Sequence, residues 1–234
     1  MYRGFVAADP HVDEFAIHGR RRAIFVDRDG TINAMFRNAA TGTIDSPMGP
    51  EEFELLPGAV QALRAFNDLG FSVIVVSNQP VVAKGKTTIE RVEATTRKLL
   101  EAASSYGARI DDVFYCLHHP QSILPELRLA CVCRKPRAGL LRQAAAKHEI
   151  DLASSYMVGD SLTDVQAGHA AACRTVWLTP HDAVVPMDEH LNASPHHRAA
   201  ALIDAARIIA DVEQRRQISA ARIDFGSRSG GSAR

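Results

Sequence analysis

The sequence predicts an α/β fold built on a doubly wound, mostly parallel sheet. Five short apolar segments of strand length alternate with segments in which apolar residues recur every three or four positions. This alternation is typical of strands joined by helical crossovers, which make neighbouring strands parallel. Polar residues directly follow several of the apolar segments, at the strand ends where open α/β sheets bind their ligands.

The first strand is expected at residues 23–26, where the run is short, apolar and β-favouring. Asp27 and Asp29 follow it directly, and Gly30 lets the backbone turn there. A carboxylate at such a strand end can attack phosphorus, and paired acids bind a hard cation such as Mg²⁺. The alternative is a solvated turn, because Asp and Gly are common turn residues.

The segments after this strand keep the alternation. Residues 33–52 are expected to form a long loop that walls the site, since long loops in compact domains are often functional. The spacing then predicts a helix at 57–69, a strand at 71–76 and, from a capping-box pattern at Thr87 and Glu90, a helix to about Tyr106. Further elements are expected as a strand at 113–115, a helix at 138–148, a strand at 155–158, a helix at 164–172, a strand at 175–178 and a helix at 199–216, with 181–198 irregular.

The chain has 234 residues and no visible domain linker. We therefore expect one domain at 22–216, an N-terminal arm at 1–21 lying on its surface, and a disordered tail at 217–234, which is Gly/Ser-rich from Gly226 onward.

Composition narrows the function. The 27 basic and 27 acidic residues balance, which gives no electrostatic argument for nucleic acid or an anionic membrane as a partner. The apolar runs are too short to span a bilayer, and residues 1–19 lack the apolar core of a secretory signal. Four unevenly spaced cysteines favour a reducing compartment over a disulfide scaffold, so we expect a cytoplasmic monomer.

Four strand ends carry groups that complement one another. Parallel strands bring these ends to one edge of the sheet, so we expect the groups to converge; they are Asp27 and Asp29, Ser77 and Asn78, Lys135, and Asp160 and Asp164. A phosphoryl group in transfer needs hydrogen-bond donors and cations around its oxygens. Ser77 can donate to the phosphate, Lys135 can neutralise charge near Asp27, and Asp160 can complete a Mg²⁺ shell with Asp27 and the Asp29 carbonyl.

A second constellation is Cys116-x-His118 followed by Cys131-x-Cys133. Three thiolates and one imidazole match a closed, structural Zn²⁺ site in number and type. The alternative is a set of buried cysteines beside a chance histidine, but the polar, Pro-containing loop between the two pairs offers little core to bury them.

The order of these motifs resembles the haloacid dehalogenase (HAD) superfamily of phosphotransferases: Asp27-x-Asp29-Gly30-Thr31, a strand ending in Ser77, a basic residue at Lys135, and Gly-Asp-x-x-x-Asp at 159–164. The resemblance implies a HAD-like Rossmannoid fold in which Asp27 is the phosphate-accepting nucleophile and Asp29 the general acid and base.

The residues around Ser77, the Cys/His pairs and the Arg134-Lys135-Pro136 run resemble more narrowly the D-glycero-D-manno-heptose 1,7-bisphosphate phosphatases, which share a family with histidinol-phosphatase domains. The resemblance covers about residues 22–178 and implies a minimal cap with a zinc-binding loop. It also implies that Asn78 and Arg134 contact a phosphorylated sugar. The longer 33–52 segment, Pro80-Val81-Val82 after Gln79, and Ser161 depart from the family pattern.

These observations predict a Mg²⁺-dependent phosphomonoesterase that releases the C7 phosphate of a heptose 1,7-bisphosphate. Rivals with the same core are a histidinol-phosphate phosphatase or another small phosphosugar phosphatase, and a nucleic-acid 3′-phosphatase, which the neutral net charge disfavours. Rivals outside catalysis are a zinc-knuckle binding module, for which the cysteines lack a neighbouring basic patch, and a zinc-containing phosphosugar-binding protein.

Overall fold

The computed structural model describes residues 6–7, 21–37, 42–179 and 194–229, with side chains up to residue 219. Strands in these ranges are β1 (Val6–Ala7), β2 (Ala23–Val26), β3 (Phe36–Arg37), β4 (Ile44–Asp45), β5 (Ser72–Asn78), β6 (Asp112–Cys116), β7 (Tyr156–Gly159), β8 (Arg174–Leu178) and β9 (His197–Ala199). Within the described part, seven of them form one parallel sheet in the order β1-β6-β5-β2-β7-β8-β9. The predicted doubly wound sheet is confirmed.

Helices cover both faces of the sheet. They are α1 (Ala59–Asp68), α2 (Ile89–Ser105), α3 (Gly139–His148), α4 (Leu162–Ala170) and α5 (Leu202–Ser229), with short 3₁₀ turns at Pro125–Leu127 and Leu152–Ser154. One apolar core joins α1, α2 and α5 to one face, and a second joins α3 and α4 to the other. Strand β2 serves both cores by alternation: Ile24 and Val26 face the first, Ala23 and Phe25 the second.

The middle of the sheet is where the strand order changes direction. β2 pairs with β5 on one side and β7 on the other, with Val26 opposite both Val75 and Val158. Because all three strands are parallel, the residues after Val26, at Ser77–Asn78 and after Gly159 meet at one edge. Ligands of doubly wound folds bind at this kind of switch point.

The sequence suggested that residues 33–52 form a long loop, but the structure contains regular elements in this segment. The segment contains the antiparallel pair β3–β4, and the start of α2 and the residues before it anchor the segment. The Thr87 hydroxyl, just ahead of the helix, and Arg91 Nε, in its first turn, both donate to the Met48 carbonyl. This contact also explains why the expected capping box at Thr87 is wrong. Helix α2 begins at Ile89 after Thr88 and has no side-chain cap, because Thr87 bonds the insert instead.

The two ends of the chain also differ from expectation. Residues 8–20 of the expected arm lie outside the described residues, but Val6–Ala7 pairs with β6 as an edge strand. His197–Ala199, inside the segment expected to be irregular, pairs with β8; a three-residue strand of mixed polarity gives no periodic signal. Helix α5 continues past residue 216 to Ser229, where a tail was expected, because no Gly or Pro interrupts it before Gly226.

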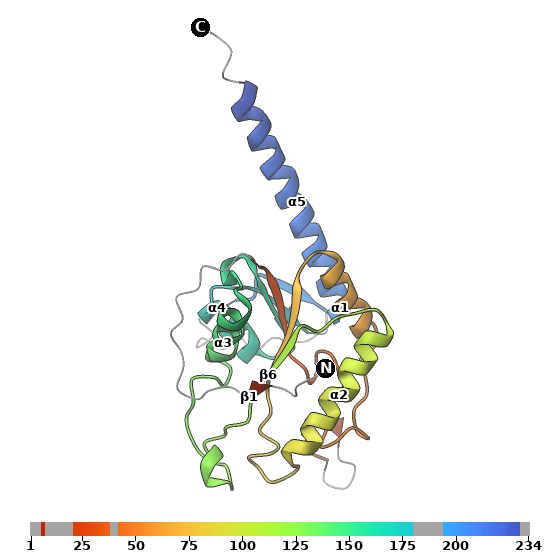
Figure 1. Cartoon of the computed structure of the whole chain (residues 1–234), viewed down its shortest axis with the longest axis vertical. Helices are drawn as coiled ribbons and strands as arrows, with labels where there is room; N and C mark the ends of the chain where they lie inside the picture. The colour runs from red at the N-terminus through yellow and green to blue at the C-terminus, as the bar shows by residue number, and fades with distance from the viewer. Residues whose placement is uncertain (1–5, 8–20, 38–41, 180–193, 230–234) are drawn as a thin grey trace.

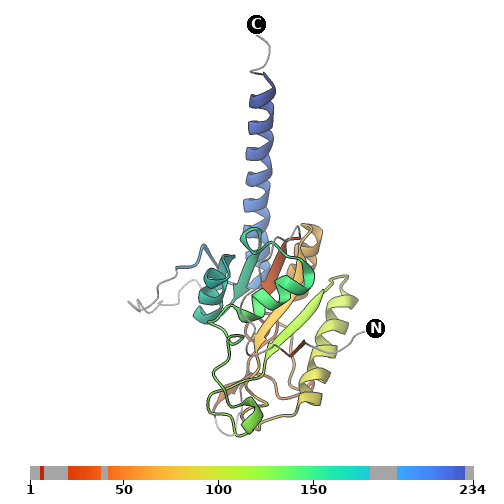
Figure 2. The same cartoon turned by 60° about the vertical axis from the view of Figure 1, so that its left-hand side comes forward.

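Figures 1 and 2 show α5 leaving the body of the molecule, with its C-terminal half projecting away from the sheet. Its first half is tied down by the buried Glu213, which accepts from the Tyr156 hydroxyl at 2.8 Å and pairs with Arg22 and Arg216. In the ranges that the structure describes, no helix is long and apolar enough to cross a bilayer.

Candidate active site

Lys135 lies at the centre of the charged groups that the sequence predicted to converge. Its ammonium is 2.9 Å from Asp27 Oδ1 and 2.6 Å from Asp164 Oδ1, and it donates to the Val76 carbonyl at 2.9 Å. Burial alone would lower the pKa of Lys135, but Asp164 and Asp27 raise it above its ordinary value. The side chain therefore stays protonated beside Asp27, where it can neutralise anionic charge.

Asp160 completes a group of three carboxylates around this ammonium. One oxygen each of Asp27, Asp160 and Asp164 lies within 4.8 Å of the others. Burial, Asp27 and Asp164 raise the pKa of Asp160 to about 7, so the single ammonium does not balance the three acids. A hard divalent cation would supply the missing charge, and carboxylate oxygens are the ligands that Mg²⁺ uses.

The donor set at this edge therefore fits Mg²⁺. Asp27 and Asp160 hold the places expected of them; Asp164 joins the group, and the contribution of the Asp29 carbonyl stays a prediction. Two features fix Asp160: an added Cβ at Gly30 (φ +82°) would lie only 2.1 Å from Asp160 Oδ2, and Trp177 Nε1 donates to the Asp160 carbonyl at 2.9 Å. Asp164 caps α4, accepting from the Ser161 amide at 3.0 Å.

Asp29 is enclosed by four hydrogen-bond donors. Arg28 grips it in a fork, with Nε 2.9 Å from Oδ1 and Nη2 3.1 Å from Oδ2. Asn33 Nδ2 donates to Oδ1 at 2.9 Å, and Gln79 Nε2 donates to Oδ2 at 2.6 Å. Although burial alone would raise the pKa of Asp29, Arg28 and the other donors lower it below its ordinary value. The carboxylate form is therefore strongly favoured in this arrangement.

Three of these partners were not predicted from the sequence: Arg28, Asn33 and Gln79. Arg28 and Gln79 are fully buried in the structure, as is Asn33. One signal could have found Arg28, namely an arginine placed between two acids directly after a buried strand, since a buried guanidinium must be paired. Nothing in the spacing of Asn33 or Gln79 predicts that they reach Asp29.

Ser77 and Asn78 end β5 beside this group. Ser77 is 2% exposed and its Oγ accepts from Gln79 Nε2 at 3.2 Å. Asn78 exchanges two 3.0 Å hydrogen bonds with the backbone of Lys135, donating to its carbonyl and accepting from its amide. The predicted substrate contact of Asn78 stays untested, but its amide has a clear structural task, which is to hold Lys135 in place.

The Cys/His cluster lies next to Lys135 and joins the end of β6 and the residues just after it, which carry Cys116 and His118, to the loop before α3, which carries Cys131 and Cys133. Cys116 Sγ is 3.5 Å from Cys131 Sγ, and His118 Nδ1 is 3.3 Å from Cys133 Sγ; all four ligand atoms lie within 4.8 Å of one another. Tetrahedral zinc with its usual bond lengths separates its ligand atoms by roughly 3.5–3.8 Å. The cluster fits Zn²⁺ in number, type and spacing of ligands.

Arg134 links the site to the loop that carries Cys131 and Cys133, called here the zinc loop. Its Nη1 donates to the His118 carbonyl at 3.3 Å, and it lines a pocket of about 290 Å³ together with Lys135 and Arg137. Two arginine residues therefore line one hollow, which suits an anionic ligand, while the Lys135 ammonium itself is buried against Asp27 and Asp164.

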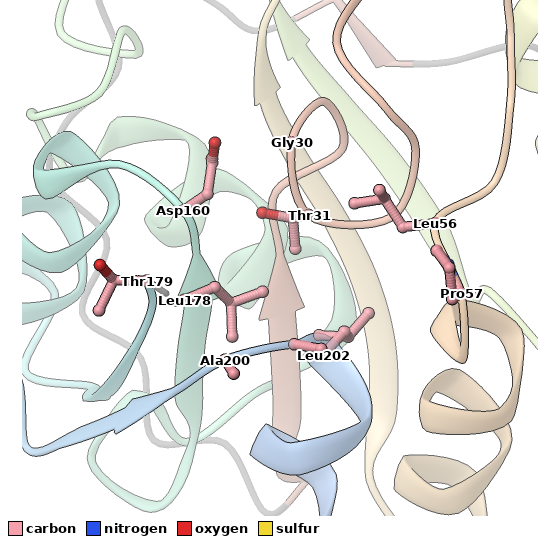
Figure 3. A pocket seen from close by; sticks show the side chains of 10 residues that line it. Gly30, Thr31, Leu56, Pro57, Asp160, Leu178, Thr179, Ala200 and Leu202 are labelled. Carbon is pink, nitrogen blue, oxygen red and sulfur yellow. The ribbon is translucent and has the colours of Figure 1, made fainter. Parts of the chain in front are cut away.

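A larger cavity of about 480 Å³ opens on the other side of Asp160 (Figure 3). Figure 3 shows Asp160 and the Thr31 hydroxyl at its upper wall and Leu56, Leu178 and Leu202 around the rest. The lining is mostly apolar, so this cavity gives room beside the carboxylates but few groups that would orient a ligand.

The chain was compared with known proteins. A family model described as HAD-hydrolase-like matches residues 132–205. A D-glycero-β-D-manno-heptose-1,7-bisphosphate 7-phosphatase of Escherichia coli strain K12 is 41% identical over 149 residues, which are 64% of this chain and 74% of that protein. The corresponding phosphatase for the α anomer from Photorhabdus laumondii is 33% identical and covers 69% and 84% of the two chains.

A solved structure agrees. The D,D-heptose 1,7-bisphosphate phosphatase from B. bronchiseptica, complexed with magnesium and phosphate, superposes with a TM-score of 0.64 at 27% identity, covering 81% of this chain and 98% of that one.

The parallel sheet and the carboxylates at its switch point, together with these matches, define a phosphatase of the haloacid dehalogenase class. Within that class the chain belongs to the family of the D-glycero-D-manno-heptose-1,7-bisphosphate 7-phosphatases.

Proposed function

We propose that this phosphatase removes the 7-phosphate of D-glycero-D-manno-heptose 1,7-bisphosphate through an aspartyl-phosphate on Asp27. The observation that carries the proposal is the position of Asp27, whose carboxylate lies beside the Lys135 ammonium and within reach of the Asp160 and Asp164 oxygens. Relatives that share this family bear the same substrate in their names.

In the first half-reaction an Asp27 oxygen attacks phosphorus and the bond to the sugar oxygen breaks. Asp29 donates a proton to that oxygen as it leaves, and its carboxyl must take up this proton when the anionic substrate binds beside it, because nearby negative charge raises the pKa of a carboxyl group. Ser77 and Lys135 donate hydrogen bonds to the transferred phosphoryl group. A Mg²⁺ ion held by Asp27 and Asp160, when bound, reduces the repulsion between the anionic nucleophile and the anionic substrate.

In the second half-reaction Asp29 takes a proton from water, and the water oxygen attacks the phosphorus of the aspartyl-phosphate. Inorganic phosphate leaves and the Asp27 carboxylate is restored. The low pKa of Asp29 supports this step, because a base must be in its carboxylate form. A structural Zn²⁺ on the four-ligand cluster would keep Arg134 and Lys135 at the site.

The charges around the site support a bisphosphate over histidinol phosphate, which carries a cationic amine. Arg134 and Arg137 border the pocket beside Lys135. Three acids of the 33–52 insert could have received an amine, but each is engaged: Asp45 pairs with Lys86 at 2.5 Å, Glu51 pairs with Arg91, and Glu52 accepts from the Met48 amide. A second phosphate is the better match for the arginines.

The test compares kcat/KM for the two compounds, using both anomers of the heptose bisphosphate because the named relatives include both. We expect a clear preference for the bisphosphate. Arg134→Ala should raise KM for it by about 10- to 100-fold, the worth of a hydrogen bond to a charged group, with a smaller change in kcat. The matched control is Arg109→Ala, whose side chain is 72% exposed before β6.

A preference for histidinol phosphate would overturn the substrate and leave the phosphatase standing. Binding of the bisphosphate without release of phosphate would instead indicate a binding protein.

The monomeric state and the cytoplasmic location are also proposals. None of the four cysteines forms a disulfide in the structure and three of them are candidate zinc ligands, which supports a reducing compartment. Light scattering on the purified protein would test the oligomeric state.

A further inference from the structure

Arg28 and Gln79 are fully buried, both at 0% exposure, and the proposed mechanism gives them no role. Their hydrogen bonds connect Asp29 with Ser77. Gln79 Nε2 donates to Asp29 Oδ2 at 2.6 Å and to Ser77 Oγ at 3.2 Å, and Gln79 Oε1 accepts from Arg28 Nη2 at 3.0 Å. One amide therefore touches the acid/base residue, the phosphate-binding hydroxyl and the guanidinium that holds Asp29.

Arg28 is in turn fixed from the far side. Its Nη1 donates to the Tyr115 hydroxyl at 3.1 Å, and its guanidinium carbon lies 5.2 Å from the centre of the Tyr115 ring. The Tyr115 hydroxyl also bonds Thr96 Oγ1 on α2 at 3.0 Å. A guanidinium held by a carboxylate, an amide and a phenol cannot turn without breaking several buried hydrogen bonds.

These contacts determine how both functional groups point. Ser77 Oγ accepts a hydrogen bond from Gln79, so the hydroxyl proton of Ser77 must point away from Gln79. The Ser77 hydroxyl is thereby left free to donate to the phosphoryl group in the proposed mechanism. Asp29 has both oxygens held by Arg28, one on each arm of the fork, which sets the plane of its carboxyl group.

We propose that Arg28 and Gln79 form a buried clamp of positioning residues that orients the Asp29 carboxyl and the Ser77 hydroxyl together. This inference rests on the proposed function, since it assigns the way in which that same site is held. Misplacing a catalytic group by about 1 Å can cost on the order of 100-fold in rate, so a clamp of this kind has a measurable effect.

The leaving group separates positioning from general structure. An alkoxide, such as that of a sugar or glycerol phosphate, needs the proton of Asp29 to leave, whereas p-nitrophenolate leaves readily without it. The value of kcat/KM reports steps up to the departure of the leaving group, and the later hydrolysis of the phosphoenzyme needs Asp29 as base for either substrate. A weakened clamp must therefore affect the two substrates unequally.

The main variant is Gln79→Met in the full-length protein, which keeps the volume and removes all three hydrogen bonds. We expect kcat/KM for the alkyl phosphate to fall by about 100-fold or more, and that for p-nitrophenyl phosphate to fall by less than about 10-fold through the Ser77 hydroxyl. A burst of p-nitrophenolate, close to one per active site, should precede slow turnover. Arg28→Lys, which keeps the charge but loses the fork, should act in the same direction.

The matched control is Tyr156→Phe. It removes a buried hydroxyl that donates to Glu213 at 2.8 Å, away from Asp29, and should lower the melting temperature without changing the ratio of the two kcat/KM values. If Arg28→Lys does not fold by circular dichroism, Gln79→Met carries the test alone.

An equal fall for both substrates without a burst, or no change in either, would overturn the clamp. Failure of the phosphatase activity itself would look different, because the unaltered protein would then release phosphate from neither substrate, whereas a different natural substrate would leave this comparison unchanged.

Discussion

Lys135 carries much of the charge balance at the level of single residues. It is 3% exposed, forms ion pairs with Asp27 and Asp164 and donates to the Val76 carbonyl, so its buried charge is paired. A buried charge is tolerated only with such partners. In the proposed mechanism the substrate phosphate enters beside this ammonium, and Asp27 is the nucleophile that attacks it.

Replacing this nucleophile gives the most direct test at the residue scale. Asp27→Asn keeps the side-chain volume but removes the attacking oxygen, so phosphate release should fall by at least about 1,000-fold with little change in fold. Asp68→Asn is the control, because that acid on α1 is 71% exposed and remote from the site. Near-normal turnover by Asp27→Asn would contradict the aspartyl-phosphate route.

Asp29→Asn offers a companion measurement. It leaves the nucleophile in place and removes both the acid for an alkoxide leaving group and the base for the second half-reaction. With labelled p-nitrophenyl phosphate, whose leaving group needs no proton, labelled phosphoenzyme should therefore accumulate and survive acid quenching.

The residues themselves explain why the site was only partly predictable. Asp27 and Asp160 directly follow strands and Ser77 lies at the end of one, so parallel pairing alone brings these three positions together. Lys135 was also expected at a strand end, but it lies on the loop before α3 and is held at the site by Asn78. Gln79 reaches Asp29 across 50 positions through its side-chain conformation, which no spacing rule contains. The role of Asn78 was unpredictable for the same reason. Its position at the end of β5 does not reveal that its side-chain amide bonds the Lys135 backbone.

At the scale of elements, the short zinc loop positions two charged residues of the site, Arg134 and Lys135. Cys131 and Cys133 are followed at once by Arg134 and Lys135, and Arg137 Nη1 donates to the Cys131 carbonyl at 2.5 Å. An added Cβ at Gly139 would lie 2.5 Å from the Val132 carbonyl, so the loop packs tightly on the start of α3. Loss of the metal should therefore displace Lys135.

Cys133→Ser is expected to release zinc, lower the melting temperature and reduce kcat by about 100-fold through the misplaced Lys135. Cys173→Ser is the matched control: the same substitution at a buried thiol outside the cluster, which should keep about one zinc per chain. Atomic emission and thermal unfolding give the two readouts. Full zinc content in Cys133→Ser would argue against this residue as a ligand.

The elements with strong periodicity were the predictable ones. Helix α1 and strand β5 appear where Val60, Leu63 and Phe66 and the run from Phe71 predict them, because both bury a continuous apolar surface. The pair β3–β4 and strand β9 are two or three residues long and gain their order from neighbours, such as the pairing of β9 with β8. Length and local pattern cannot reveal an element of that kind.

For the molecule as a whole, the site concentrates negative charge at the centre of a neutral protein. The pKa of Asp160 is raised to about 7, against roughly 3.9 for an unfolded chain. Between these values the folded state holds a proton that the unfolded state has lost. The contribution of this group therefore makes the metal-free protein less stable as the pH rises towards and past 7.

At low pH, magnesium binding must first release the proton of Asp160, which weakens binding. At high pH the Asp160 carboxylate is already ionised. The increase in melting temperature caused by Mg²⁺ should therefore be larger at pH 8 than at pH 5.5, by an amount on the order of 1–2 kcal/mol of stability. Taking the difference with and without Mg²⁺ removes the contribution of groups away from the site. Asp160→Asn should reduce the pH dependence of this increase without abolishing it, because the pKa of Asp164 beside it is also raised, to about 6. An equal increase at both pH values in the unaltered protein would contradict the assignment.

Trp177 gives this metal site an optical reporter. The chain has one tryptophan, and its indole is 7% exposed with Nε1 donating to the carbonyl of Asp160 at 2.9 Å. All tryptophan emission of the molecule therefore comes from one ring. That ring is hydrogen-bonded to the backbone of Asp160, whose carboxylate is a candidate ligand of the cation. Changes in that emission follow events at Asp160 in real time, so ion binding and phosphoenzyme turnover can be observed by stopped-flow fluorescence without attaching a dye.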